Sequence, residues 1–159
     1  MVRGPTILAV EQEAEDILLL RRAFAKSKVL NPLQVVQSAE EAIRYLNGQG
    51  EYANRDEFPT PSLVLLGLAR SHPDGLGILY WIRQQPGLNG VRVIVTTRSK
   101  NLEDINRASE LGAEACLLKP LDFDRLCEFC QALGGHWIWL DKLPEGLAGR
   151  HLLVGRAPE

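Results

Sequence analysis

The stretch "LVLLGLARSHPDG", Leu63 to Gly75, decides how the rest of the chain is interpreted. It begins with a continuous apolar run of strand length, which predicts a central strand buried on both faces. It ends in Asp74-Gly75, a pair typical of a turn that leads into a helix. The run breaks at Gly67, which has no side chain with which to do chemistry. The stretch therefore predicts a strand and a loop placed for function, with a gap where a functional side chain is expected.

The sequence on either side repeats a strand-then-helix pattern. Short apolar segments alternate with segments in which apolar residues recur at helical spacing. Such alternation predicts a parallel sheet with helices on both faces, because parallel connections need crossovers and right-handed crossovers cover the sheet. The predicted strands are "TILAV" (6–10), "NPLQVV" (31–36), "SLVLLGL" (62–68), "VRVIVTT" (91–97) and "ACLL" (115–118), and the predicted helices span about 11–28, 38–48, 74–85, 101–112 and 122–133.

Local signals predict where several elements begin and end. Ser38 stands three residues before Glu41, the capping-box spacing in which each side chain bonds the other's backbone amide. Gly48 is expected to end that helix, and Gly112 to end a later one where a left-handed residue is wanted. The segment from Gln49 to Pro61 has no clear periodicity and contains two prolines, so it predicts a long surface loop.

Length and composition limit the function classes. The 159 residues suit one domain, over residues 1–133, with a C-terminal extension over 134–159. A net charge of −2 without a run of Lys and Arg argues against nucleic acid as a partner. Three cysteines, an odd number, predict a reducing compartment and hence the cytoplasm. The longest apolar runs are far shorter than the roughly 20 residues that cross a bilayer, so no membrane span is predicted.

Ligands of a doubly wound sheet bind at the carboxyl ends of the strands. At these positions the chain has "ILAVEQ", "LVLLGLARSHPDG", "VIVTTRS" and "GAEACLLKP". As a set, these segments resemble the receiver domain of bacterial response regulators, the CheY-like family, across about residues 5–133. The chain is especially similar to the stand-alone receivers associated with phytochrome-type sensor kinases, which share the long loop before the third strand and an aromatic ending. The resemblance implies a flavodoxin-like (βα)5 α/β fold, a doubly wound parallel five-stranded sheet in the order 2-1-3-4-5.

The resemblance also implies a phosphorylation site, which this chain matches only in part. In the family, an Asp ending the third strand accepts a phosphoryl group, and an acidic pair after the first strand helps to hold Mg²⁺. A Thr or Ser ending the fourth strand contacts the phosphate, and a Lys before Pro offsets its charge. Carried over by position, the acceptor falls on Gly67 and the metal-binding member of the pair on Gln12. Glu11, Thr97 and Lys119 match the family pattern.

Two carboxylates that the chemistry needs are therefore missing. A Gly cannot be phosphorylated, and a neutral Gln binds a hard dication less well than a carboxylate does. The aromatic switch position of the fifth strand falls on Cys116, which is too small to act as a rotamer switch. These departures predict an atypical receiver, not an enzyme, that works without phosphorylation, metal or cofactor. The expected partners are a sensor kinase or a downstream regulator, and a second copy of the chain in a homodimer.

Other interpretations stay open. Phosphorylation could fall on a displaced residue of the same loop, for which Ser71, His72 and Asp74 are the candidates. The pocket could instead hold a small molecule, as in flavodoxins, although "EQEAED" is acidic where a phosphate loop is expected. A hydrolase is the weakest option, because no nucleophile stands beside a His at the strand ends. Without an acceptor Lys119 needs another partner, for which Glu11 is predicted.

The last predicted helix contains a cysteine pair. Cys127 and Cys130 form a C-x₂-C with His136 nearby, a spacing that zinc sites also use. The pair falls on the apolar side of the predicted helix, and no second pair follows. Ordinary packing is therefore predicted, and no metal.

Two features follow that helix. Trp137 and Trp139 come after a Gly-Gly pair, and they are expected to form either a lid on the domain or an anchor for a partner. The family resemblance favours a lid that also contributes to dimerisation. The short apolar run "HLLV" (151–154) is expected either to add an edge strand or to remain mobile. No separate effector domain is predicted.

Overall fold

The structure, a computed structural model, describes residues 6–26, 32–68, 75–97, 102–113, 115–118 and 152–154. Its strands are β1 (Ile7–Val10), β2 (Leu33–Val36), β3 (Leu63–Gly67), β4 (Arg92–Thr97), β5 (Ala115–Leu118) and β6 (Leu152–Val154). Its helices are α1 (Ala14–Lys26), α2 (Ala39–Asn47), α3 (Gly75–Gln84) and α4 (Leu102–Glu110), with the 3-10 helices η1 (Gly50–Tyr52) and η2 (Pro86–Leu88). The helix predicted over 122–133 lies outside the described residues. No helix within them is long and apolar enough to cross a membrane.

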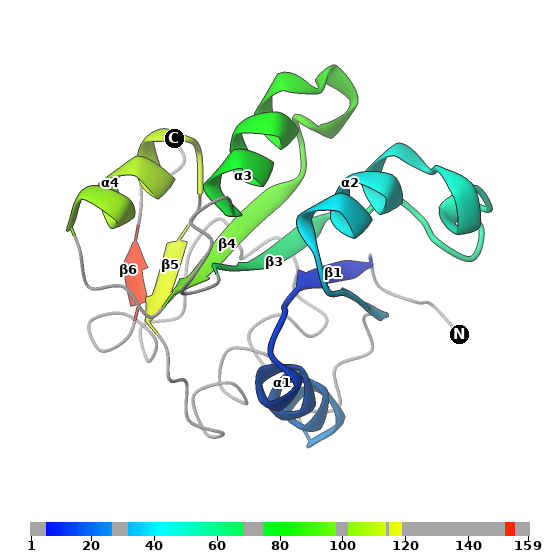
Figure 1. Ribbon diagram of the computed structural model, residues 1–159, viewed down its shortest axis with the longest axis horizontal. Coiled ribbons are helices and arrows are strands. Elements are labelled where there is room, and N and C mark those ends of the chain that lie inside the picture. Colours follow the sequence, from blue (N-terminus) through cyan, green and yellow to red (C-terminus); the bar gives the residue numbers. More distant parts are fainter. Residues whose placement is uncertain are drawn as a thin grey trace.

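The strands form one sheet in the order β2-β1-β3-β4-β5-β6 (Figure 1). The first five strands are parallel, which confirms the predicted order 2-1-3-4-5. The sixth strand runs antiparallel to β5, with Leu153 opposite Cys116. Of the two expectations for the run "HLLV", the edge strand is the one observed. The sheet therefore has one strand more than predicted.

Helices cover both faces of the sheet, as predicted. α2, α3 and α4 lie on one face and α1 on the other (Figure 1). Every residue of β1 and β3 is buried, as expected for central parallel strands covered on both sides. Alternate strand residues point to opposite faces, and one set packs under the three helices. That core includes Leu8, Val10, Val64, Leu66, Val93 and Val95 from the strands and Tyr45, Leu46, Leu76, Leu79 and Ile82 from the helices.

Two glycines end helices at the predicted positions. Gly48 caps α2 with a φ of 65°, and its N–H bonds back to the last turn. Gly112 follows α4 with a φ of 98°. Both values lie in the left-handed region, where a residue with a Cβ is strained.

Arg55 organises the connection from α2 to β3. Its Nη1 donates to the carbonyls of Tyr45 at 2.8 Å and Phe58 at 2.9 Å, and its Nη2 to that of Leu46 at 3.0 Å. Carbonyls at the end of a helix have no partner inside it, so the guanidinium supplies one. The rings of Tyr45, Tyr52 and Phe58 pack beneath, with centroids 5.0 to 5.9 Å apart. The predicted loop is thus a folded segment with its own 3-10 turn, which the lack of periodicity concealed.

Arg83 makes a second set of hydrogen bonds of the same kind, from its guanidinium to backbone carbonyls. Its Nη1 donates to the carbonyl of Val91 at 2.8 Å and its Nη2 to that of Gly112 at 2.9 Å. These bonds join the last turn of α3 to the segments that enter β4 and β5. Both sets of arginine hydrogen bonds lie at the amino ends of the strands. The candidate site lies at the opposite, carboxyl ends.

Candidate functional site

The residues predicted to form a site lie at the carboxyl ends of neighbouring strands. Glu11 follows β1, Gly67 ends β3 and Thr97 ends β4. Val10 pairs with Leu66 across β1 and β3, so Glu11 and Gly67 come next at the same level of the sheet. The fold therefore brings these two positions together, although they are far apart in the sequence.

The side chain of Glu11 lies against Gly67. A Cβ atom on Gly67 would stand 2.5 Å from Glu11 Oε2 and 2.8 Å from both Oε1 and Cδ. Cβ atoms essentially never approach other heavy atoms closer than 3.0 Å. The carboxylate thus occupies the place of the first carbon of any side chain at position 67. A side chain at position 67 would therefore require the end of the flexible Glu11 side chain to move.

Backbone contacts orient Glu11. Its N–H donates to the carbonyl of Val36 at 3.0 Å, which ties the end of β1 to the end of β2. The N–H of Gln12 donates to Glu11 Oε1 at 3.3 Å. Glu11 is half-buried and Gly67 is buried, whereas Gln12 is exposed. The carboxylate therefore turns inward over β3.

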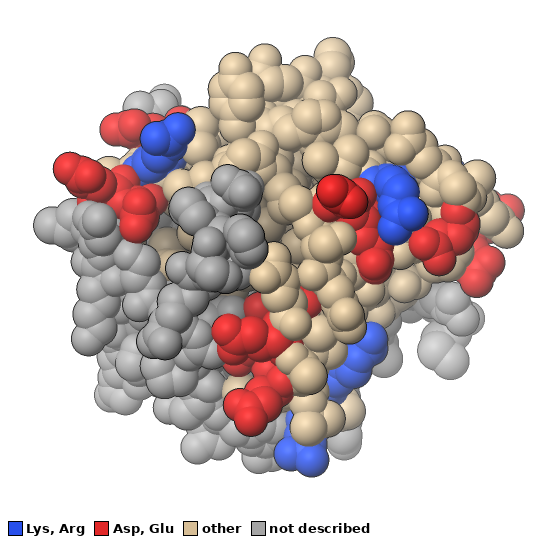
Figure 2. All heavy atoms as spheres, in the orientation of Figure 1, with Lys and Arg blue, Asp and Glu red and all other residues tan. Residues whose placement is uncertain are grey.

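The described donors fit poorly the Mg²⁺ that the family resemblance implies. Magnesium is held mainly by carboxylate oxygens and water, and Glu11 alone supplies a carboxylate among positions 11, 12 and 67. In the part of the chain that the structure describes, no three His, Cys, Asp or Glu side chains are grouped so as to hold a metal ion. Figure 2 shows acidic side chains gathered where β1 leads into α1, and Glu15 and Asp16 lie in the first helical turn. That placement complements the helix dipole, so it has a structural explanation.

Two buried threonines end β4. Thr97, the predicted phosphate contact, is 4% exposed, and Thr96 is 7% exposed. Thr96 pairs with Gly67, and paired residues of neighbouring strands point to the same face of a sheet. Its hydroxyl has no hydrogen-bond partner in the described structure, although buried hydroxyls are normally bonded. Thr97 is predicted from the sequence, whereas Thr96 is found only through the strand register.

Cys116, which the family resemblance assigns to the aromatic switch position, belongs to the core. It is buried and packs in the cluster under α2, α3 and α4. Burial raises the pKa of its thiol to about 11. The thiol therefore stays protonated at neutral pH, in which form it is unreactive.

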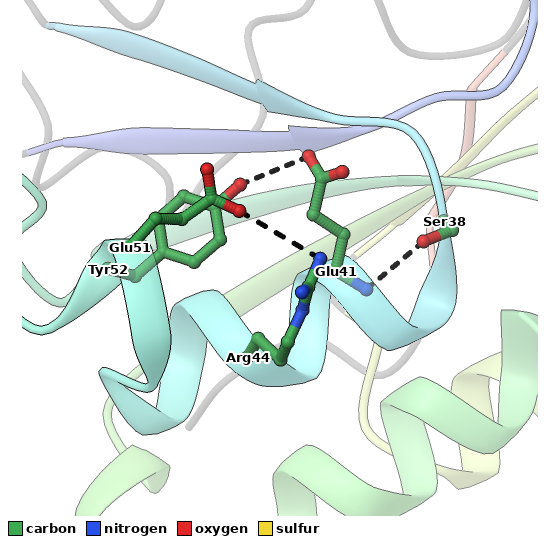
Figure 3. A network of polar contacts seen from close by, with 5 residues as sticks. All are labelled: Ser38, Glu41, Arg44, Glu51 and Tyr52. Atoms are coloured by element: carbon green, nitrogen blue, oxygen red, sulfur yellow. Dashed lines mark hydrogen bonds and ion pairs between the residues drawn. The ribbon is translucent and has the colours of Figure 1, made fainter.

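A polar network runs along α2 from Ser38 at its start to η1 beyond its end (Figure 3). Ser38 Oγ accepts a hydrogen bond from the N–H of Glu41 at 3.1 Å, which confirms one half of the predicted capping box. The other half is wrong, because Glu41 Oε1 instead accepts from the hydroxyl of Tyr52 at 3.1 Å. Burial, with a further contribution from this bond, raises the pKa of Tyr52 to about 12. Arg44 and Glu51 lie 3.9 Å apart at the exposed side of the network.

Several predicted positions lie outside the described residues. Lys119 is one of them, so the predicted Glu11–Lys119 pair stays a prediction. The alternative acceptors and the features of the last predicted helix and its extension stay predictions for the same reason: Ser71, His72, Asp74, Cys127, Cys130, His136, Trp137 and Trp139.

Comparisons with known proteins agree with this arrangement of strands. The family described as "Response regulator receiver domain" matches residues 7–131. Response regulator Rcp1 of Synechocystis is 31% identical over 138 residues, which cover 87% of this chain and 92% of Rcp1. The Mn²⁺-bound structure of Rcp1 has a TM-score of 0.71 and covers 89% of this chain and 98% of that one, at 29% identity.

Two further solved structures are similar over most of their length. Response regulator RPA3017, in red light signalling of R. palustris, has a TM-score of 0.74 at 28% identity, covering 92% of this chain and 97% of its own. The phosphorylated cyanobacterial phytochrome response regulator RcpA has a TM-score of 0.73 at 30% identity, covering 89% and 99%. The chain is thus similar to whole proteins and to proteins of light signalling.

Proposed function

This chain belongs to the response regulator receiver domain family of two-component signalling, and on that premise we propose that it works without aspartyl phosphorylation. The observation that carries the proposal is that β3 ends in a glycine, Gly67, where the family has its acceptor, and the Glu11 carboxylate lies against it. Position 67 has no side-chain oxygen to accept a phosphoryl group, and the Glu11 carboxylate lies where the Cβ of an acceptor would be.

The electrostatics of the edge support the same conclusion. Transfer of a phosphoryl group to a carboxylate brings negative groups together, so it needs positive charge to offset their repulsion. RcpA has been solved in its phosphorylated form and Rcp1 with Mn²⁺. In this chain the acceptor position is Gly67 and the second acidic position is the exposed Gln12. Both requirements of the reaction are absent from these positions.

The signal then passes through protein contacts. The partner is a sensor kinase or a downstream regulator, and the chain acts as a homodimer in the cytoplasm, without an enzymatic activity of its own. Residues 1–133 form the receiver and residues 134–159 the extension that contributes to dimerisation. The pairing of residues 152–154 with β5 supports an extension that returns to the receiver sheet.

The test is the mass of the intact protein after incubation with acetyl phosphate and Mg²⁺. The natural chain is expected to remain unmodified. The Gly67→Asp, Gln12→Asp double variant, in which the flexible end of the Glu11 side chain moves away from the new Asp, is expected to gain one phosphoryl group. Uptake of phosphate by the natural chain would contradict the proposal. Peptide mapping would then show whether Ser71, His72 or Asp74 is the displaced acceptor.

A further inference from the structure

We propose that Glu11 is the built-in occupant of the acceptor position and that Glu11 and Gly67 work as one coupled pair. The inference rests on the proposed function, and it adds the residue that takes over the space of the missing acceptor. Here both carboxylate oxygens and Cδ lie within 2.8 Å of where the Cβ of residue 67 would be.

The contacts of Glu11 explain how it keeps this position. The backbone of Glu11 is fixed to β2 through the carbonyl of Val36, and the next N–H, that of Gln12, points at Oε1. Glu is one methylene longer than Asp, so its carboxylate reaches from the end of β1 to the end of β3. Gly67 is buried and has ordinary strand geometry in its pairing with Thr96. Its lack of a side chain therefore serves the close approach of Glu11 rather than a backbone conformation.

The coupling makes Gly67→Ala depend on Glu11. With Glu11 present, the added methyl group must displace the carboxylate and its bond from Gln12, because the two overlap. With Glu11→Ala, the same methyl group enters vacated space, and Ala is intrinsically better than Gly within a strand. The sign of the effect of Gly67→Ala is therefore expected to change between the two backgrounds.

The first experiment is a double-mutant cycle followed by thermal unfolding. Gly67→Ala is expected to lower Tm by up to about 3 °C in the natural background, where the end of the Glu11 side chain must move, and to leave Tm unchanged or raised with Glu11→Ala. Additive effects would overturn the proposal, because the loss of Tm with Gly67→Ala would then not depend on Glu11. The loss would arise from the β-strand itself. If Gly67→Ala fails to fold, folding of the double variant supports the pair, and its failure to fold overturns it.

The second experiment measures charge rather than space. Gly67→Asp places a second carboxylate against Glu11, whereas Gly67→Asn adds a side chain of the same shape without the charge. Without divalent cation, Gly67→Asp is expected to have the lower Tm, and MgCl₂ is expected to raise the Tm of that variant alone. A Tm of the natural chain that rises equally with MgCl₂ would overturn the proposal.

The outcomes separate this inference from the proposed function. Phosphorylation of the natural chain would contradict the proposed function, whatever the cycle shows. An additive cycle in a chain that stays unphosphorylated would contradict only the Glu11–Gly67 pair.

Discussion

The amino ends and the carboxyl ends of the parallel strands depend on different kinds of chemical group. At the amino ends, Arg55 and Arg83 donate to backbone carbonyls, which are present whatever residue supplies them. At the carboxyl ends, the family's chemistry depends on particular side chains, and the positions that the family resemblance assigns to two of these hold Gly67 and Gln12. The contacts that build the sheet do not depend on a side chain at either position. Under the proposed function, the receiver fold is therefore kept without its phosphorylation chemistry.

The largest expected loss in the free energy of unfolding concerns Arg55, at the amino ends of the strands. Arg55→Ala leaves the carbonyls at the end of α2 and in the following segment without their shared donor. Because bonds from charged donors contribute about 1.5–3 kcal/mol each and losses are not additive, we expect a loss of about 3 kcal/mol in the free energy of unfolding. Tm should fall by about 6–12 °C. Urea and thermal unfolding measure both quantities.

Arg44→Ala is the matched control for that variant. Arg44 also carries a guanidinium near the end of α2, but its contact with Glu51 is long and both side chains are exposed. Exposed ion pairs contribute about 0–1 kcal/mol. A loss with Arg44→Ala as large as that with Arg55→Ala would break the comparison, because surface charge would then explain both.

The next largest expected loss in the free energy of unfolding concerns the hydrogen bonds that Arg83 makes. Gly112→Ala forces a Cβ onto a φ of 98° and places it 2.8 Å from Arg83 Nε. Left-handed strain costs about 1–2 kcal/mol, and displacement of the guanidinium adds to it, so we expect a loss of about 2 kcal/mol. Gly77→Ala is the control, since it lies in α3 with nothing within 4 Å. It should stabilise the chain by about 0.5–1 kcal/mol, and a loss in both variants would contradict this account.

Most of the fold could be predicted from the sequence because its signals are local. The buried run of β3, the cap at Ser38 and the glycine at 112 each act within a few residues, and strand–helix alternation then restricts the topology. The α2–β3 connection could not be predicted in this way. Its order comes from Arg55, which reaches carbonyls nine and ten residues earlier, and such contacts leave no periodicity.

The candidate site could be located but not understood from the sequence. Spacing alone puts Glu11, Gly67 and Thr97 at strand ends, and the structure brings the first two together. The direction of the Glu11 side chain depends on a rotamer and on a neighbouring strand, which one-dimensional patterns do not contain. The placement of Thr96 beside Gly67 likewise comes from the strand register, and its hydroxyl has no hydrogen-bond partner in the described structure.

A smaller loss in the free energy of unfolding is expected from two tyrosine hydrogen bonds, one to a backbone acceptor and one to a side-chain acceptor. The hydroxyl of Tyr45 donates to the carbonyl of Pro59 at 3.0 Å, and that of Tyr52 donates to Glu41. Each Tyr→Phe variant should cost about 1 kcal/mol at neutral pH. Burial raises both pKa values from 10.0 to about 12, so the folded state holds these protons more tightly than the unfolded state.

The contribution of these tyrosines is therefore complete below pH 10 and is lost as the pH rises toward 12. The double Phe variant should show a weaker decline of unfolding free energy across this range, measured by urea unfolding at several pH values. Tyr80→Phe, at a position 56% exposed, is the control. An equal change in slope with that variant would contradict the assignment to the buried pair.

The smallest expected change in the free energy of unfolding concerns a residue at the carboxyl ends of the strands. Gln12 stands at the family's metal-binding position but is exposed, and only its backbone N–H takes part in a described contact, the bond to Glu11. Gln12→Ala keeps that N–H, so the free energy of unfolding should change by less than about 0.5 kcal/mol, with or without Mg²⁺. Gln12→Asp is the matched variant, because it adds the missing charge at the same exposed position. A Mg²⁺-dependent rise in stability with Gln12→Asp alone would mean that Glu11 and one further carboxylate suffice to recruit the cation. The absence of an acceptor at Gly67, and not the loss of metal ligands, would then be what keeps this edge of the sheet from phosphorylation.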